Sequence, residues 1–180
     1  TTIPVLDLVF RFYPIVFSVM LGIGTYYLVL NLFESKIGNW RVRVAAIISL
    51  YFVYFAGSFG WIVEYLKQKT LGGESAFWAN QSISFNLNPP FAISLLIIIA
   101  FLHIYIKSNK LKSINGIIIS VLLLGSLAGF KSYAAALMIV SLTPIALISI
   151  MKKEWSLFYI TAFATLFSLI IYLFNFQPGQ

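Results

Sequence analysis

The sequence predicts an all-α protein, a polytopic bundle of about six transmembrane helices. Of its 180 residues, 61% are apolar and only 9% are charged, whereas a soluble domain carries about 45–50% apolar and roughly 25% charged residues. The apolar residues gather in runs close to the roughly 20 residues that a helix needs to cross a bilayer core about 30 Å thick. The absence of cysteine excludes a disulfide scaffold, a thiolate metal site and a cysteine nucleophile. Together these observations exclude a water-soluble globule and predict an integral membrane protein.

Six apolar runs are predicted to span the bilayer. The first run ends before Glu34, and the second lies between Arg43 and Lys67. The third begins at Pro90 and ends before Lys107. In chain order, the predicted spans are 13–33, 44–66, 90–106, 114–130, 132–150 and 156–176.

The boundary between the fourth and fifth spans follows from length. As one helix, residues 114–150 would be about 55 Å long at 1.5 Å per residue, nearly twice the thickness of the hydrocarbon core. We therefore expect the chain to turn near Lys131, and the sixth span to follow Trp155. Gly125 and Gly129 form a pair of small residues four apart, which predicts a close approach of a neighbouring helix.

The orientation follows from the distribution of basic residues, because cytoplasmic loops of membrane proteins are enriched in Lys and Arg. Of the 12 basic residues, eight lie in the connections after the first, third and fifth spans and four lie on the other face. We therefore predict a multi-pass protein of the bacterial inner membrane with loops 34–43, 107–113 and 151–155 in the cytoplasm and loop 67–89 outside. The net charge of +7 does not indicate a nucleic-acid partner, since this bias already explains where the basic residues lie.

The chain is expected to form one transmembrane domain over residues 1–180. It begins at Thr1 without an initiator Met, a basic leader or a cleavage site. We therefore expect it to be part of a longer protein.

The long outer loop, residues 67–89, is the first candidate for chemistry. It carries an acid, Glu74, after two glycines, an indole at Trp78, and the amides of Asn80 and Gln81. An indole face stacks on a sugar ring, and amides bind neighbouring hydroxyls through paired donors and acceptors. These residues are therefore candidate contacts for a sugar or an acceptor. The alternative is a solvated loop whose aromatic side chains rest in the membrane interface.

Lys131 and Glu64 are the remaining candidates for substrate binding. Lys131 lies at the predicted outer turn between two spans, where desolvation is costly unless the ammonium snorkels to the interface or meets an anion. A lipid phosphate would suit it as a partner. Glu64 lies at the outer end of the second span, one helical turn after Trp61. Snorkelling alone is the alternative interpretation for Lys131.

The sequence predicts no cofactor. His103 is the single histidine and lies away from the acids, so neither a histidine-rich metal cage nor a Ser-His-Asp triad is indicated. A divalent metal has no support in these residues. No glycine-rich phosphate loop of the G-x-x-x-x-G-K-[ST] type occurs either, which leaves a nucleotide hydrolase without support.

Several segments resemble the middle of polytopic glycosyltransferases of the GT-C superfamily. Arg11-Phe-Tyr-Pro14 is similar to their R-x-x-P entry from the outer face, and the following apolar helix ends in an L-x-x-x-L-F-like pattern at Phe33. Ala45, Ala46 and Leu50 match the A-A-x-x-x-L pattern of the next helix. Further segments that resemble bacterial proteins of this type are Gly73-Glu-Ser-Ala-Phe-Trp78, Asn88-Pro-Pro-Phe-Ala92 and Gly129-Phe-Lys-Ser-Tyr-Ala134.

The resemblance implies an enzyme that moves a sugar from a polyprenyl-phosphate donor to a glycan, lipid or protein acceptor on the extracytoplasmic face. It places the donor phosphate and the sugar on the outer face, where Lys131 and the long loop are predicted to lie. Such enzymes carry their acidic catalytic motif in the first outer loop, so the catalytic residues are unknown here and are expected upstream of Thr1.

Three other functions are compatible with the sequence. A polytopic transporter or flippase would carry charges facing an intramembrane cavity, whereas nearly all charges here lie at loop ends. A non-catalytic membrane subunit would use the outer loop for docking. An O-antigen-polymerase-like enzyme is a near neighbour of the glycosyltransferase hypothesis, because it also acts on polyprenyl-linked glycans outside the membrane.

Overall fold

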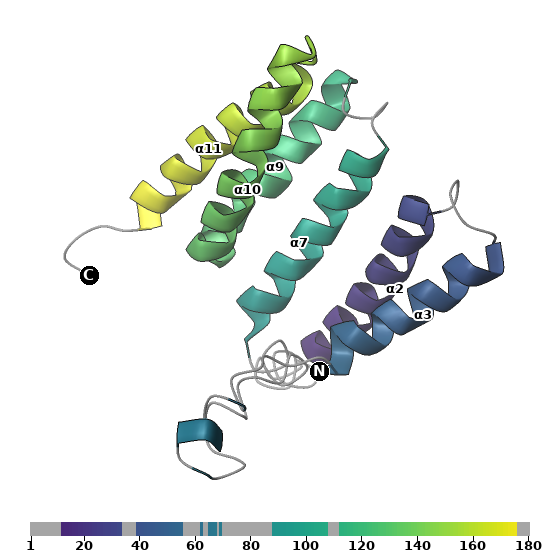
Figure 1. The fold of residues 1–180 in the computed structure, drawn as a ribbon. Coiled ribbons are helices and arrows are strands. Elements are labelled where there is room, and N and C mark those ends of the chain that lie inside the picture. The colour runs from purple at the N-terminus through teal and green to yellow at the C-terminus, as the bar shows by residue number, and fades with distance from the viewer. Residues whose placement is uncertain are drawn as a thin grey trace, which may run out of the picture. The chain divides into compact units, whose positions relative to one another are not determined.

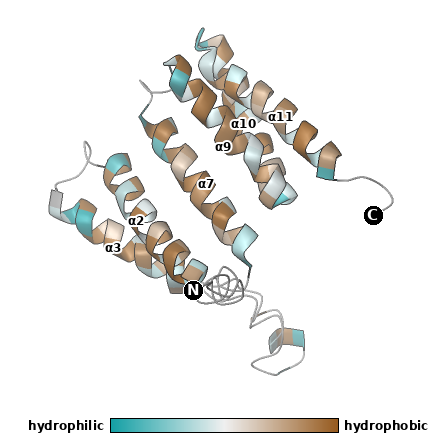
Figure 2. Ribbon diagram, turned by 180° about the vertical axis from the view of Figure 1, so that it is seen from behind, coloured by the Kyte–Doolittle hydropathy of each residue, from teal (hydrophilic) through white to brown (hydrophobic). Residues whose placement is uncertain are grey.

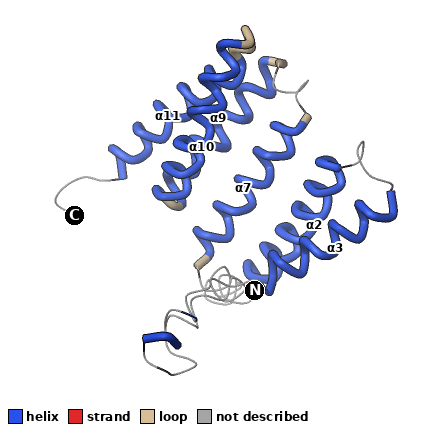
Figure 3. The backbone as a smooth tube through the Cα atoms, viewed as in Figure 1, coloured by secondary structure: helices blue, strands red, loops and turns tan. Residues whose placement is uncertain are grey.

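The computed structural model places six helices, which are the main elements of the fold (Figure 1). The residues that the structure describes are 12–33, 39–55, 62, 65–67, 69, 88–107 and 112–175. Within these ranges the chain is helical apart from short turns and contains no strand (Figure 3). The predicted all-α fold class is confirmed.

The chain divides into two compact units, and the division falls within one helix, between Ala92 and Ile93. Unit 1 contains α2 (Tyr13–Phe33) and α3 (Asn39–Phe55), which pack against each other as a hairpin. Gly22 permits this contact, because a Cβ atom at this position would overlap the phenol of Tyr54. The hydroxyl of Tyr54 also donates a hydrogen bond to the backbone carbonyl of Ser18, so the two helices are joined by both packing and a polar contact.

Unit 2 contains most of α7 (Pro89–Ile106), together with α9 (Ile114–Phe130), α10 (Ser132–Met151) and α11 (Ser156–Asn175). The helices α9, α10 and α11 all pack on one another, and α9 and α11 share the most extensive interface. The residues at the centre of the unit's hydrophobic core are fully buried: Phe101, Leu124, Leu127, Ile160 and Ala164.

Small residues allow α9 and α11 to approach closely. A Cβ atom at Gly125 would overlap the ring of Phe167, so only glycine fits there without rearrangement. One step along the same interface, the hydroxyl of Ser168 donates to the carbonyl of Gly125 at 3.3 Å. A Cβ atom at Gly129, by contrast, would lie 3.5 Å from Ile171, an ordinary contact. The close approach predicted for this pair of glycines is therefore located at Gly125.

Helix length and surface both indicate a membrane protein. Four of the described helices are long and apolar enough to cross a bilayer, namely α2, α7, α10 and α11, and α9 is a shorter apolar helix. Large apolar side chains point outward on these helices, for example Val140, which is 69% exposed, and Phe174, which is 77% exposed. Figure 2 shows hydrophobic residues distributed along the helices. Exposed apolar side chains of this kind are unfavourable in water but not in lipid, because the hydrocarbon core is itself apolar.

The helix bounds agree closely with the ranges expected from the sequence, with one difference. The second helix begins at Asn39 instead of residue 44, so Arg41 and Arg43 belong to α3. Arginine is a good helix former and its long side chain can reach the aqueous interface from a helix end, so charge marks the end of the apolar stretch but not of the helix. The predicted extension to residue 66 passes through residues outside the described ranges. That all six helices cross the bilayer, as one domain and in the predicted orientation, stays a prediction.

Candidate functional site

Lys131 forms the junction between α9 and α10, where the sequence predicts a turn. Its backbone is extended, with φ −148° and ψ 104°, and it is the single residue between the two helices. Its N–H donates to the carbonyl of Leu127 at 2.8 Å, which completes α9, and its own carbonyl accepts from Ala134 and Ala135 at 3.0 and 3.3 Å, which begins α10. These local hydrogen bonds therefore fix the backbone of Lys131 at the point where the chain reverses direction.

The electrostatics around Lys131 favour a negative partner. No side chain caps the first turn of α10, and the unsatisfied N–H groups at the start of a helix carry a partial positive charge that attracts anions. The ammonium of the half-buried Lys131 adds a full charge beside this helix start. It also lies 5.7 Å from the ring centroid of Tyr133, within the range of a cation–π interaction.

No carboxylate in the described parts of the chain neutralises this charge. The single acid there is Glu154, which lies 3.8 Å from Lys112 at the opposite end of unit 2. The C-terminus of α9, whose partial charge is negative, supplies a modest favourable interaction of about 0.3–1 kcal/mol for a cation at this position. Lys131 therefore has a favourable helix-end interaction but no paired acid among these residues.

A pocket of about 530 Å³ opens at the junction, and most of its polar groups can donate hydrogen bonds. These are the ammonium of Lys131, the hydroxyls of Ser132, Tyr133 and Tyr172, and the amide of Asn175. Tyr172 and Asn175 come from the last turn of α11, so the site joins the end of one helix to the start of another. A pocket of this size lies within the range of small-molecule sites, which is roughly 300–1,000 Å³.

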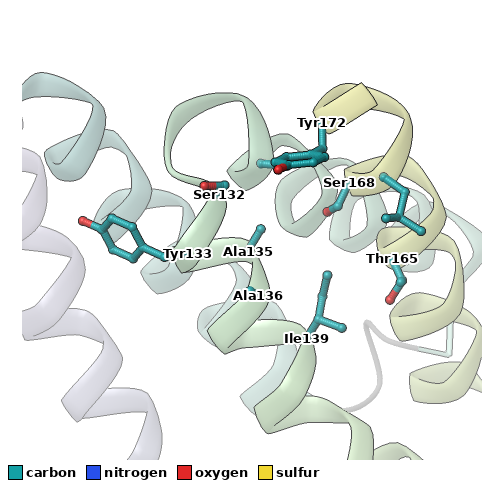
Figure 4. Close-up of a pocket in the computed structure, with 10 residues that line it drawn as sticks. Ser132, Tyr133, Ala135, Ala136, Ile139, Thr165, Ser168 and Tyr172 are labelled. Carbon is teal, nitrogen blue, oxygen red and sulfur yellow. The ribbon is translucent and has the colours of Figure 1, made fainter. Parts of the chain in front are cut away.

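A second cavity, of about 360 Å³, continues from this pocket along the interface of α10 and α11 (Figure 4). The two share Ala128, Ser132, Tyr133 and Tyr172 as lining residues. In Figure 4 the ring of Tyr172 extends from α11 toward α10 near Ser132, while Ala135, Ala136 and Ile139 follow along α10. We refer to this second cavity as the α10–α11 groove and to the first as the Lys131 pocket.

Of the six candidate residues from the sequence, the structure places Lys131 alone. Outside the described residues lie Glu64, Glu74, Trp78, Asn80 and Gln81. Their predicted contacts with a sugar or acceptor therefore remain predictions. Within the described ranges, no group of three or more His, Cys, Asp or Glu side chains is placed to hold a metal ion.

Ser132, Tyr172 and Asn175 are site residues that sequence reasoning missed. Tyr172 and Asn175 belong to the sixth predicted span, and an alternation of spans across the bilayer puts the end of this span on the same face as Lys131. The topology thus contained a signal for this proximity. The pairing of α11 with α10 and α9, which brings the residues together, follows from packing and not from the sequence order alone.

The opposite end of unit 2 carries a different set of charges. The exposed lysines at this end are Lys107, Lys112, Lys152 and Lys153. Trp155 is half-exposed and lies in contact with the rings of Phe158 and Tyr159, as expected for an aromatic belt at a membrane interface. Figure 1 shows that the connection between α10 and α11 lies at this end, far from the junction of α9 and α10.

Comparison with known proteins assigns no family to the chain. No protein-family model matches the sequence, and neither a curated protein nor a solved structure matches it significantly. The functional interpretation therefore depends on the residues and the geometry of the Lys131 pocket.

Proposed function

We propose that the protein acts as a membrane glycosyltransferase that moves a sugar from a polyprenyl-phosphate donor to a glycan, lipid or protein acceptor on the extracytoplasmic face. The observation that carries the proposal is the Lys131 pocket, in which a half-buried ammonium lies beside the uncapped start of α10 and has no paired carboxylate among the residues that the structure describes. The resemblance to GT-C glycosyltransferases supplies the reaction, and the pocket supplies a place for the donor phosphate.

The chemistry of the reaction explains why a cation is useful at this position. In sugar transfer, the bond between the anomeric carbon and the phosphate oxygen breaks, and negative charge develops on the departing phosphate. A lysine and helix N–H groups that are already oriented stabilise this charge in the transition state without reorganisation. A carboxylate would take the proton from the acceptor hydroxyl as general base. No residue of this sequence is assigned to that role.

The lining of the Lys131 pocket distinguishes phosphate binding from simple snorkelling. A snorkelling lysine needs only an aqueous interface for its ammonium. Lys131 instead shares its pocket with the phenols of Tyr133 and Tyr172 and the amide of Asn175, all of which can donate to phosphate oxygens. The presence of several donors in one pocket supports an anion as the partner.

Replacement of Lys131 tests the proposal in the full-length protein reconstituted in nanodiscs. We expect Lys131→Ala to weaken the binding of undecaprenyl phosphate about 10- to 100-fold, since a hydrogen bond to a charged group contributes about 1.5–3 kcal/mol. We expect Lys131→Arg to retain most of the binding because it keeps the charge. Lys152→Ala is the matched control, as it removes one exposed lysine at the opposite end of unit 2.

Sugar transfer measured in the same preparation separates the possible functions. We expect transfer of radiolabelled hexose from a polyprenyl-phosphate-linked donor, and a loss of this activity in Lys131→Ala. Equal binding by wild type and Lys131→Ala would contradict the role of the pocket. Flux of the donor across proteoliposome membranes without sugar transfer would favour a flippase, and a stable partner protein without sugar transfer would favour a non-catalytic subunit.

A further inference from the structure

The α10–α11 groove begins where the Lys131 pocket ends. Four lining residues are common to both cavities, so a molecule could occupy them together. The Lys131 pocket collects hydrogen-bond donors around a cation, whereas the groove continues between Ala135 and Ala136 on α10 and Leu169 on α11. An anionic head joined to an apolar chain matches this change from polar to apolar surroundings.

Two polar side chains of the groove on α11 are already hydrogen-bonded within the protein. The hydroxyl of Thr165 donates to the carbonyl of Thr161 at 2.7 Å, and that of Ser168 donates to the carbonyl of Gly125 at 3.3 Å. Because both donors are directed to the backbone, a bound chain would meet mainly methyl and methylene groups. A hydrocarbon therefore fits the groove without leaving these hydroxyls unsatisfied.

The groove is short. Its lining on α10 extends from Ser132 to Ile139 and on α11 from Tyr172 back to Thr165. Seven residues of helix correspond to about 10 Å, which is the length of roughly two extended isoprene units. A cavity of about 360 Å³ has room for a short branched hydrocarbon of this length.

We propose that the α10–α11 groove holds the two isoprene units nearest the phosphate of the donor and leaves the rest of the chain in the bilayer. The protein would then recognise the first ten carbons of a prenyl phosphate and be insensitive to total chain length. This inference rests on the proposed function, because it requires the phosphate to lie at Lys131. It adds a limit on how many isoprene units of the lipid the protein contacts.

A series of prenyl phosphates tests this limit on the wild-type protein in nanodiscs. The probes are dimethylallyl, geranyl, farnesyl and undecaprenyl phosphate, with each affinity expressed per mole fraction in the bilayer. We expect a gain of about fivefold from the first to the second, because packing in the groove replaces looser contacts with lipid. We expect changes below about twofold beyond geranyl phosphate, since additional units remain in lipid in both the free and bound states. A continued rise with length would overturn the inference.

Filling the groove tests its location. Ala136 lines the groove and is exposed, so Ala136→Leu adds bulk there without disturbing the buried core. We expect it to weaken geranyl phosphate binding about fivefold and to leave dimethylallyl phosphate binding within about twofold, because the shorter chain stays near the pocket. Leu137→Phe is the matched control, since Leu137 is the next residue, is 64% exposed and does not line the groove.

The outcomes separate the two proposals. Loss of binding in Lys131→Ala together with no effect of Ala136→Leu, or with an affinity that depends on full chain length, would overturn the groove assignment and leave the proposed function standing. Equal binding of decyl phosphate and geranyl phosphate would overturn the assignment to an isoprenoid chain. Failure of the wild-type protein to bind any of the four prenyl phosphates would overturn both proposals.

Discussion

The two ends of unit 2 both carry lysine, but in different surroundings. At one end, Lys112 is 64% exposed and lies 3.8 Å from Glu154, with Lys152 and Lys153 nearby and also exposed. At the other end, Lys131 is half-buried among tyrosines at the start of an uncapped helix. The first set of charges is solvated and partly neutralised by a carboxylate, whereas Lys131 has the ring of Tyr133 and the C-terminus of α9, but no carboxylate, as favourable neighbours among the described residues.

The candidate site is therefore identified by the surroundings of a charged residue and not by the number of charged residues. Exposed ion pairs contribute little free energy because water and salt screen them. Partial burial of a cation is unfavourable because the charge loses water, and a bound anion can offset this loss. The single lysine at the α9–α10 junction is therefore a better candidate for ligand binding than the larger cluster at the opposite end.

The interface of α9 and α11 is the most extensive contact in unit 2. We therefore expect a substitution there to have the largest effect on stability and on ligand binding. Gly125→Leu would overlap the ring of Phe167, and overpacking of this kind costs about 1–3 kcal/mol, with the upper value expected here because the overlap includes ring and Cβ atoms of Phe167. We expect a large drop in the thermal unfolding temperature of the protein in nanodiscs and a loss of prenyl phosphate binding.

Gly129→Ala is the control for that substitution. A Cβ atom at Gly129 meets only Ile171, at 3.5 Å, and alanine is about 0.8–1 kcal/mol more favourable than glycine within a helix. We expect an unfolding temperature equal to or above that of the wild type. If both variants unfolded at the same lowered temperature, the close contact at Gly125 would not be what organises unit 2.

Removal of one phenol at the Lys131 end should have an intermediate effect. Tyr172→Phe deletes a donor hydroxyl from the pocket while keeping the ring that borders it. A neutral hydrogen bond contributes about 1 kcal/mol, so we expect undecaprenyl phosphate to bind about fivefold more weakly. Tyr159→Phe is the matched control on the same helix at the opposite end, where it contacts Trp155. Equal effects of the two variants on binding would remove the distinction between the ends.

Much of the fold could be predicted from the sequence because lipid imposes simple rules on it. Apolar runs of bilayer length must be helices, since their backbone groups find no water, and the predicted turn at Lys131 follows from the length of residues 114–150. The predicted start of the second helix, residue 44, differs from the observed start at Asn39, because Arg41 and Arg43 end the apolar run but continue the helix.

The site could be predicted only in part. Lys131 was identifiable as a charge at a turn between two apolar runs. Tyr172 and Asn175 were not, because their proximity to Lys131 depends on how α11 packs against α9 and α10, and this packing is set by Gly125, Phe167 and Ser168. Helix packing in membranes depends on such shape contacts and not on burial from water. A periodic pattern of hydrophobicity therefore carries little information about which helices are neighbours.

The smallest effect is expected at the lysine-rich end. Glu154→Gln removes the acid partner of Lys112, and both side chains are well exposed, 60% and 64% respectively. An exposed ion pair of this kind contributes about 0.2–1 kcal/mol at most, so we expect the unfolding temperature to change by no more than about 2–4 °C and prenyl phosphate binding to stay unchanged. Thermal unfolding at low and high salt checks the first expectation, because salt should abolish even this small difference. A loss of prenyl phosphate binding in Glu154→Gln would mean that the two ends are coupled, and the contrast between the solvated cluster and the candidate lysine at the α9–α10 junction would have to be abandoned.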